Sequence, residues 1–263
     1  MWMMLVSSFT DEGALRKSLG LVFFPKPFTL AAYRSVFSDN RIVSGFQSSV
    51  FLAIVGTLCT LALVSMAAYP LSKDLRYKAP IGFIFYFTVL FSGGMIPTFL
   101  WYRDLNLLNN IWSLILLNMA PPFYIILMRN FFAEIPQELE ESALMDGAGR
   151  ARVLLSIVLP LSKPVMATVG LMAMVGYWNS WFAPMIYMIG AKNQWPLSTI
   201  LQQMLNAAFQ ARPSDMVFEG GILTPKESFK YATLIVTMTP ILCVYPFAQK
   251  YFAKGLLIGA IKG

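Results

Sequence analysis

Five long uncharged stretches constrain this chain more than any other feature of its sequence. A helix needs about 20 predominantly apolar residues to cross the roughly 30 Å hydrocarbon layer of a bilayer. Each stretch meets or nearly meets that length, and none carries an acidic or basic side chain in its interior. They cover residues 42–72, 79–102, 105–128, 164–191 and 231–249. We therefore predict an all-α, polytopic membrane protein with five complete transmembrane helices.

A sixth apolar segment, residues 1–9, is too short to cross a bilayer. It has no basic leader, which argues against a signal peptide. We interpret it as the end of a sixth helix whose beginning is missing; a short interfacial segment is the alternative. The whole chain, residues 1–263, is then one transmembrane domain.

Charge and cysteine content exclude several kinds of partner. The net charge is +7, but the 20 Lys and Arg residues are scattered along the chain, which favours lipid headgroups over nucleic acid. Cys59 and Cys243 lie in apolar runs of a chain that has no His, so we expect no metal site. We also expect no catalytic residues.

The source of energy for any transport must lie outside the chain. The spans contain no buried charge of the kind that ion-coupled transporters use. No Gly-rich loop ending in Gly-Lys-Ser or Gly-Lys-Thr is present to bind a nucleotide. A transporter built on this sequence would need an energy-converting partner.

The positive-inside tendency gives an orientation. Lys73, Arg76 and Lys78 cluster at one helix junction, and the tail is basic, which places both segments in the cytoplasm. Counting spans then places residues 129–163 in the cytoplasm and residues 10–45 and 192–230 outside. Within the second outer loop, apolar spacing predicts a helix at 197–209 lying outside the membrane, with Ser198 as its N-cap.

The segment 129–163, here called the docking loop, is the main polar interruption of the sequence. It holds five of the 13 acidic residues. Pro136 suits the first turn of a helix, and Gly147 can take the left-handed conformation that ends one. A second helix is expected from 148 to 158, stopping at Leu159 and Pro160. Two short helices joined by a glycine turn are typical of an element to which another protein binds.

The docking loop resembles the Glu-Ala-Ala loop of bacterial binding-protein-dependent ATP-binding cassette (ABC) importer permeases. The one departure is Ser142, where the family usually has alanine. The residues that carry the resemblance are Glu141, Ser142, Ala143, Gly147, Ile157, Leu159 and Pro160, with Asp146 closing the first helix. Residues 24–33 and 249–263 resemble carbohydrate permeases, the latter the maltose-type second permease, and residues 92–110 resemble members that handle polymeric carbohydrates such as alginate.

This resemblance implies the type I importer permease fold in a bacterial inner membrane. It implies a second, different permease, two ATPases that bind ATP and magnesium, an extracytoplasmic solute-binding protein, and no cofactor on this chain. Glu141 would pair with a cation of the ATPase, Gly147 would set the bend, and Ala143 would permit close contact.

Aromatic and amide side chains are the candidates for a carbohydrate path, because sugars stack on aromatic faces and bond to amides. They are Tyr177, Trp178, Asn179 and Trp181; membrane-interface anchors are the alternative reading. Asn118 near Pro121 lies among residues that loosen helices, as do Gly93 and Gly94, and such positions suit either a path or close helix packing.

Two rival functions fit the same composition. A stand-alone channel or facilitator would need no docking loop and no ATPase. A structural or regulatory membrane subunit would transport nothing.

Overall fold

The chain is all-helical in a computed structural model that describes residues 2–17, 23–25, 27–73, 78–210 and 228–243. The described part holds only an isolated β-bridge, between Thr10 and Phe28. The chain divides into two compact units. Unit 1 comprises Met1–Phe51 and Trp178–Val244, and unit 2 comprises Leu52–Tyr177 and Tyr245–Gly263. The predicted all-α class is confirmed.

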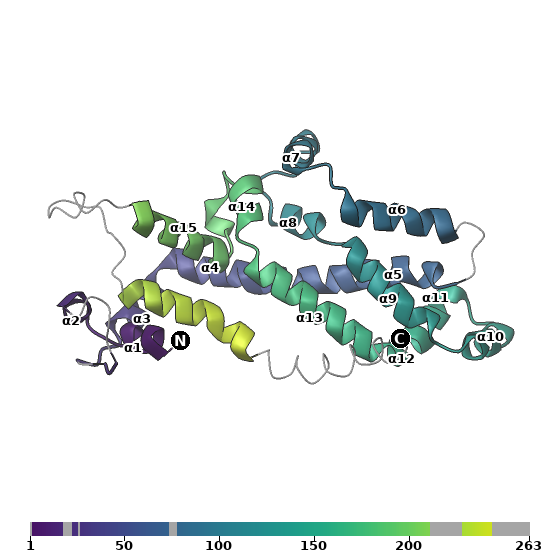
Figure 1. Cartoon of the computed structure of the whole chain (residues 1–263), viewed down its shortest axis with the longest axis horizontal. Coiled ribbons are helices and arrows are strands. Elements are labelled where there is room, and N and C mark those ends of the chain that lie inside the picture. The colour runs from purple at the N-terminus through teal and green to yellow at the C-terminus, as the bar shows by residue number, and fades with distance from the viewer. Residues whose placement is uncertain (1, 18–22, 26, 74–77, 211–227, 244–263) are drawn as a thin grey trace. The chain divides into compact units, whose positions relative to one another are not determined.

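The helices of each unit follow in chain order (Figure 1). Those described in unit 1 are α1 (Trp2–Ser8), α2 (Glu12–Lys17), α3 (Ala31–Ser38), α4 (Asn40–Phe51), α14 (Phe182–Tyr187), the 3-10 helix η3 (Lys192–Gln194), α15 (Leu197–Gln210) and the helix Ser228–Cys243. Those described in unit 2 are the π-helix η1 (Leu52–Gly56), α5 (Thr57–Leu71), α6 (Lys78–Leu90), α7 (Met95–Asp104), α8 (Ile111–Leu117), α9 (Pro122–Ala133), α10 (Gln137–Met145), α11 (Arg150–Val153), the π-helix η2 (Leu154–Val158) and α12 (Leu159–Leu161). Helix α13 (Lys163–Asn179) runs from unit 2 into unit 1.

The expectation of five complete spans is supported in part. In the described part of the chain, Asn40–Leu71 alone is both long and apolar enough to cross a membrane as one helix. Three further candidates are helix pairs bent by more than 40°, which raises the number of spans to four at most if each pair crosses once. The apolar helix Ser228–Cys243 is shorter, and residues 244–249 of the fifth predicted span lie outside the described residues.

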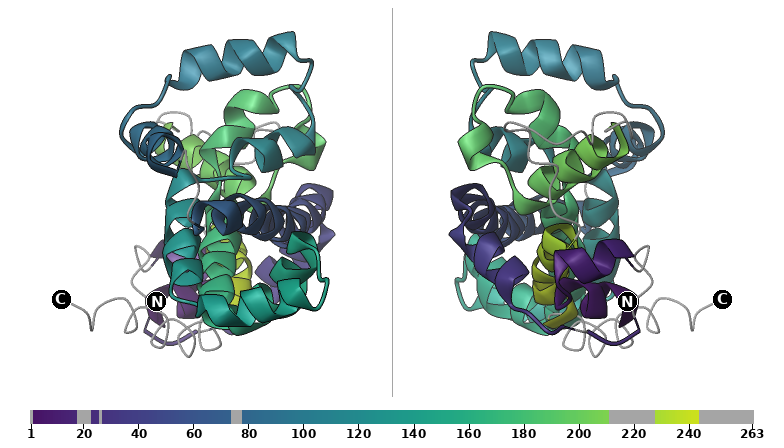
Figure 2. Two further views of the ribbon diagram at one scale, coloured as in Figure 1. Left: turned by 90° about the vertical axis from the view of Figure 1, so that its right-hand side faces the viewer. Right: turned by 90° about the vertical axis from the view of Figure 1, so that its left-hand side faces the viewer.

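The bends fall where residues that loosen helices interrupt the spans. Ala79–Leu90 and Met95–Asp104 meet at 109°, and the break contains Gly94 at φ +87°, which favours glycine. Figure 1 shows α7 end on while α6 lies in the plane; at the top of both views in Figure 2, α7 lies in the plane instead. Ile111–Leu117 and Pro122–Ala133 meet at 53°, where Pro122 begins α9 because its missing N–H is no loss at a first helical position.

The core of unit 2 is built around α5 and α9. Val64, Met128, Phe132 and Val169 are completely buried there, together with Val158 of η2. Within a bilayer such side chains hold helices together by close van der Waals packing, because lipid tails are as apolar as the core itself. The core therefore anchors the base of the docking loop to the helices on which it rests.

In unit 1, α15 packs against α4. The predicted helix at 197–209 is confirmed as α15, but the predicted N-cap is wrong. Ser198 donates to the Ser180 carbonyl at 2.9 Å, while the first backbone N–H of α15, that of Leu197, donates to Ser49 Oγ at 2.8 Å. A side chain distant in sequence supplies the cap, so sequence spacing could not reveal it.

Candidate functional site: the docking loop

Helix α10 begins at Gln137, one residue later than its sequence predicts. Pro136 stands at the N-cap, one residue before the helix, with extended ψ of 128°. Glu138 and Glu140 lie in the first turn, where the positive end of the helix dipole favours acidic side chains. These features of the helix start can be recognised from the local sequence.

Gly147 ends α10 in the geometry of a Schellman motif. Its φ is +83°, and its N–H donates to the Leu144 carbonyl at 3.0 Å. The N–H of Ala148 donates to the Ala143 carbonyl at 3.0 Å. These two bonds satisfy carbonyls that the helix end would leave free, and they require a residue that tolerates the left-handed region. The expected bend at Gly147 is present.

The second helix differs from its prediction. It starts at Arg150 and continues through the π-helix η2 to Leu161, so it does not stop at Leu159 and Pro160. The N–H of Leu159 donates to the Leu154 carbonyl, five residues back, which is the wider π pattern. A π turn just before Pro160 relieves the crowding that a proline ring normally causes in a helix.

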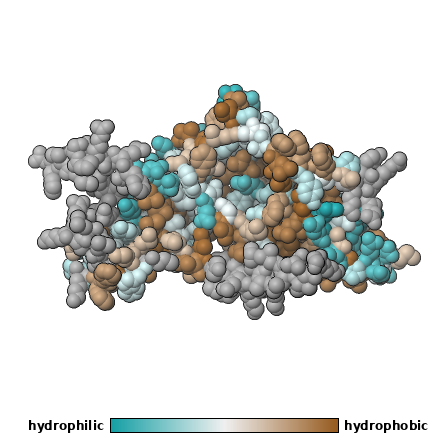
Figure 3. Space-filling view, viewed as in Figure 1, coloured by the Kyte–Doolittle hydropathy of each residue, from teal (hydrophilic) through white to brown (hydrophobic). Residues whose placement is uncertain are grey.

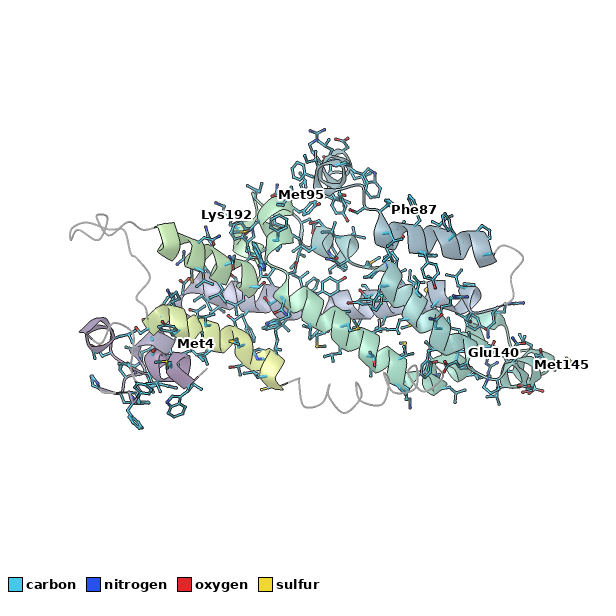
Figure 4. All side chains as sticks on the ribbon, in the orientation of Figure 1. Met4, Phe87, Met95, Glu140, Met145 and Lys192 are labelled. Atoms are coloured by element: carbon cyan, nitrogen blue, oxygen red, sulfur yellow. The ribbon has the colours of Figure 1, made fainter. Side chains whose placement is uncertain are left out.

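One face of α10 is open to contact. Glu141, Ser142 and Asp146 are exposed, as is Gly147. Leu144 is exposed too, and Met145 is 88% exposed. Figure 3 shows hydrophilic surface gathered over the end of unit 2 that holds α10, and Figure 4 places Met145 at its outer tip. Sequence reasoning missed Leu144 and Met145, although an apolar pair ending an otherwise acidic helix is a visible signal.

The other face of the docking loop packs on the chain's own core. Ala143, Ala148, Ile157 and Leu159 are partly buried against the core cluster of unit 2. Pro160 is exposed. The small side chain at position 143 thus allows α10 to lie close to its own support, and the motif residues divide between an outward and an inward set.

Glu140 is the exception among the acidic residues of α10, because it is only 6% exposed. Its Oε2 accepts a hydrogen bond from the Tyr69 hydroxyl at 3.1 Å, and its Oε1 is ion-paired with Lys73 Nζ. The sequence suggested only a carboxylate at a helix N-terminus. Its partners lie on and just after α5, about 70 positions earlier, which local patterns do not reveal.

Two of the predicted path residues, Tyr177 and Asn118, lie in unit 2 near the hydroxyl of Thr60. Tyr177 is 4% exposed, and its hydroxyl donates to the Ile115 carbonyl at 3.2 Å. Thr60 Oγ1 lies 3.1 Å from that hydroxyl and 3.4 Å from the Asn118 carbonyl oxygen. The Asn118 side chain itself is exposed. Tyr177 therefore uses its hydroxyl to join α5, α8 and α13.

The other three path candidates lie in unit 1. Trp178 is buried, and its Nε1 donates to the Thr237 carbonyl at 3.1 Å while its ring meets Phe46 edge to face. Asn179 is exposed, and Trp181 is 41% exposed. Within unit 1, Asn179 and Trp181 are the candidates whose side chains remain open to a ligand.

These observations define the class of protein to which the chain belongs. The chain is a helical membrane protein with bent spans and a two-helix loop whose outer face is free. Residues 42–258 match the family described as "Binding-protein-dependent transport system inner membrane component", and the chain belongs to this family. The resemblance seen in the docking loop is thereby confirmed, as is an inner-membrane location.

Particular relatives cover nearly the whole chain. The polygalacturonan/rhamnogalacturonan transport system permease protein YtcP of Bacillus subtilis is 41% identical, over 92% of this chain and 85% of its own. Protein LplC of the same organism is 40% identical, over 98% of this chain and 87% of its own. A chain in the crystal structure of a bacterial ABC transporter that imports the acidic polysaccharide alginate is 32% identical with a TM-score of 0.85, over 95% of this chain and 89% of that one. The fold is that of an ABC importer permease.

Proposed function

We propose that this chain is the permease subunit of an ATP-driven carbohydrate importer and that its docking loop seats on a cytoplasmic ATPase. The observation that carries the proposal is the outer face of α10. Glu141 supplies a negative charge there, and Leu144 and Met145 supply exposed apolar surface at the end of the helix. A charge beside a small apolar anchor is an arrangement that suits a protein interface.

We propose the following assembly around the chain, by analogy with the family. A second, different permease completes the transmembrane path, two ATPase subunits bind ATP and magnesium, and an extracytoplasmic binding protein delivers the solute. We also propose five full crossings and the end of a sixth for this chain. The five are Asn40–Leu71, the bent pairs α6 with α7 and α8 with α9, helix α13, and the helix that begins at Ser228. ATP-driven closure of the ATPases then moves α10, and the helices packed on it follow.

For the substrate, we propose an oligosaccharide that contains uronic acid. YtcP is described as a permease for polygalacturonan and rhamnogalacturonan, and the structural relative imports alginate, an acidic polysaccharide. Asn179 and Trp181 offer an amide and an aromatic face that suit a sugar ring.

The docking proposal is tested by copurification. The chain is coexpressed with its second permease and ATPase, extracted in detergent and isolated through a tag on this chain. We expect the ATPase to be retained by the wild type and lost from Glu141→Lys. Glu134→Lys reverses an exposed charge just before α10 and should retain the ATPase. Retention by Glu141→Lys would contradict the role of Glu141, and absence of ATPase from the wild type would contradict the proposal itself.

The substrate proposal is tested with vesicles that hold the complete transporter and its binding protein. We expect uptake of labelled oligogalacturonides to exceed uptake of neutral malto-oligosaccharides of equal length. Equal or reversed preference would contradict an acidic substrate while leaving ATP-driven import intact.

A further inference from the structure

A buried carboxylate connects the docking helix to the end of a membrane helix. Glu140 points from α10 toward the body of unit 2, on the side opposite the exposed Met145 (Figure 4). Each of its oxygens has one partner: Oε2 accepts from Tyr69 in the last turns of α5, and Oε1 is paired with Lys73 just beyond that helix. Lys73 Nζ also lies 5.2 Å from the centroid of the Tyr69 ring. The three side chains form one cluster, here called the Glu140 cluster.

The Glu140 cluster fixes the orientation of α10 relative to α5 as well as the contact between them. Apolar packing of Ala143 and Ala148 already holds α10 on the core, but such packing is not directional. A charge-assisted pair and a hydrogen bond to the same carboxylate fix position and orientation together. A buried carboxylate without its partners is strongly unfavourable, so α10 cannot slide along α5 without losing this stabilisation.

A second bond secures the same end of α5. Arg129 Nε of α9 donates to the Leu71 carbonyl at 3.1 Å, and Ser72 Oγ donates to the Tyr69 carbonyl at 2.7 Å. The terminus of α5 is therefore fixed to α9 through the backbone and to α10 through Glu140. The junction between α10 and α5 is therefore held too firmly to absorb a displacement of α10.

We propose that Glu140 is a positioning residue that transmits movement of the docking helix to α5 through Tyr69 and Lys73. The inference rests on the proposed docking of α10 to an ATPase. The exposed Glu141 makes the outward contact, and its buried neighbour Glu140 makes the inward one. Loss of the Glu140 cluster leaves the ATPase bound, but part of the movement of the ATPase is then not transmitted to α5.

The experiment measures solute transported per ATP hydrolysed by the complete transporter in vesicles. Glu140→Gln and Lys73→Met should each lower this ratio roughly fivefold, within the range by which residues along a coupled network alter coupling. Both variants should retain the ATPase on copurification. Glu138→Gln removes an exposed carboxylate from the same helix and should leave the ratio unchanged.

A charge exchange separates positioning from general stability. The double variant Glu140→Lys with Lys73→Glu restores an ion pair in reverse, and its ratio should exceed that of either single variant. Tyr69→Phe keeps the ring and the ion pair, so it should assemble normally and lower the ratio less than Glu140→Gln does.

Two outcomes would overturn the inference. One is a wild-type ratio in Glu140→Gln and Tyr69→Phe with the ATPase bound; the other is an equal fall of transport and hydrolysis, which shows a purely structural role. Failure of the docking proposal looks different, since the wild-type complex would then retain no ATPase.

Discussion

Gly147 and Gly149 are separated by one residue and tolerate a side chain very differently. A Cβ on either would meet open space, so sterics between side chains do not distinguish them. The backbone does: Gly147 has φ +83°, whereas Gly149 has φ −71°. The left-handed conformation costs an L-residue roughly 1–2 kcal/mol, and the extended one costs nothing.

We expect Gly147→Ala to loosen the Schellman end of α10 and to reduce transport per ATP, because the tip that carries Leu144 and Met145 loses its fixed geometry. The destabilisation is about 1 kcal/mol, which is compatible with insertion in the membrane. Reconstituted vesicles provide the measurement. Gly149→Ala is the matched control and should behave as wild type; equal behaviour of the two variants would contradict the assignment.

Tyr177 and Trp181 should separate structure from substrate contact. Tyr177→Phe removes a buried hydroxyl bonded to the Ile115 carbonyl and should lower stability by about 1 kcal/mol without changing substrate preference. Trp181→Ala removes a half-exposed ring and should raise the KM for the oligosaccharide with little change in melting temperature. Thermal unfolding in detergent and uptake kinetics measure the two effects. A changed preference in Tyr177→Phe alone would reverse this assignment.

At the scale of elements, α15 depends on α4 for its start. Ser49→Ala removes the acceptor for the Leu197 N–H and should destabilise the first turn of α15 by about 1 kcal/mol, as loss of an N-cap does. Hydrogen exchange of the amides of residues 197–200 should become faster. Ser44→Ala, which removes a hydroxyl that donates to the Arg41 carbonyl of the same helix, is the control. Unchanged exchange in Ser49→Ala would show that packing alone holds the turn.

Gly56 allows the π-helix η1 to pack closely against Tyr177 of α13. A Cβ on Gly56 would lie 2.8 Å from Cε2 and Cζ of Tyr177, whose ring is held by its hydroxyl bonds. Gly56→Ala should displace that ring and destabilise unit 2 by about 1–3 kcal/mol, the usual cost of overpacking. A lower melting temperature is the expected readout. Gly176→Ala adds a methyl group to open space on α13 and should not lower it; an unshifted Gly56→Ala would mean that the ring yields freely.

For the whole molecule, the absence of charge within the predicted spans and the free face of α10 belong together. Under our proposal the chain takes its energy from an ATPase partner, and the docking loop is the element to which that partner binds. We expect vesicles containing both permeases but no ATPase to show no uptake. Addition of ATPase and ATP to the side that exposes the docking loop should start it. ATP-independent uptake by the permeases alone would instead favour a channel.

The sequence by itself determined whatever depends on neighbouring residues. Hydropathy gave the all-α class, Pro136 and Gly147 gave the limits of α10, and the motif spacing gave the family. These features are local, because caps and glycine turns depend on a few adjacent positions.

Only the tertiary structure decided which side chains face inward and where spans bend. It paired Glu140 with Tyr69 and Lys73, used Ser49 instead of Ser198 to cap α15, and satisfied the hydroxyl of Tyr177 within the helix packing. It also bent two apolar stretches that hydropathy presents as continuous, residues 79–102 and 105–128. Contacts between residues far apart in the chain depend on how helices pack, and that information has no period or spacing in the sequence.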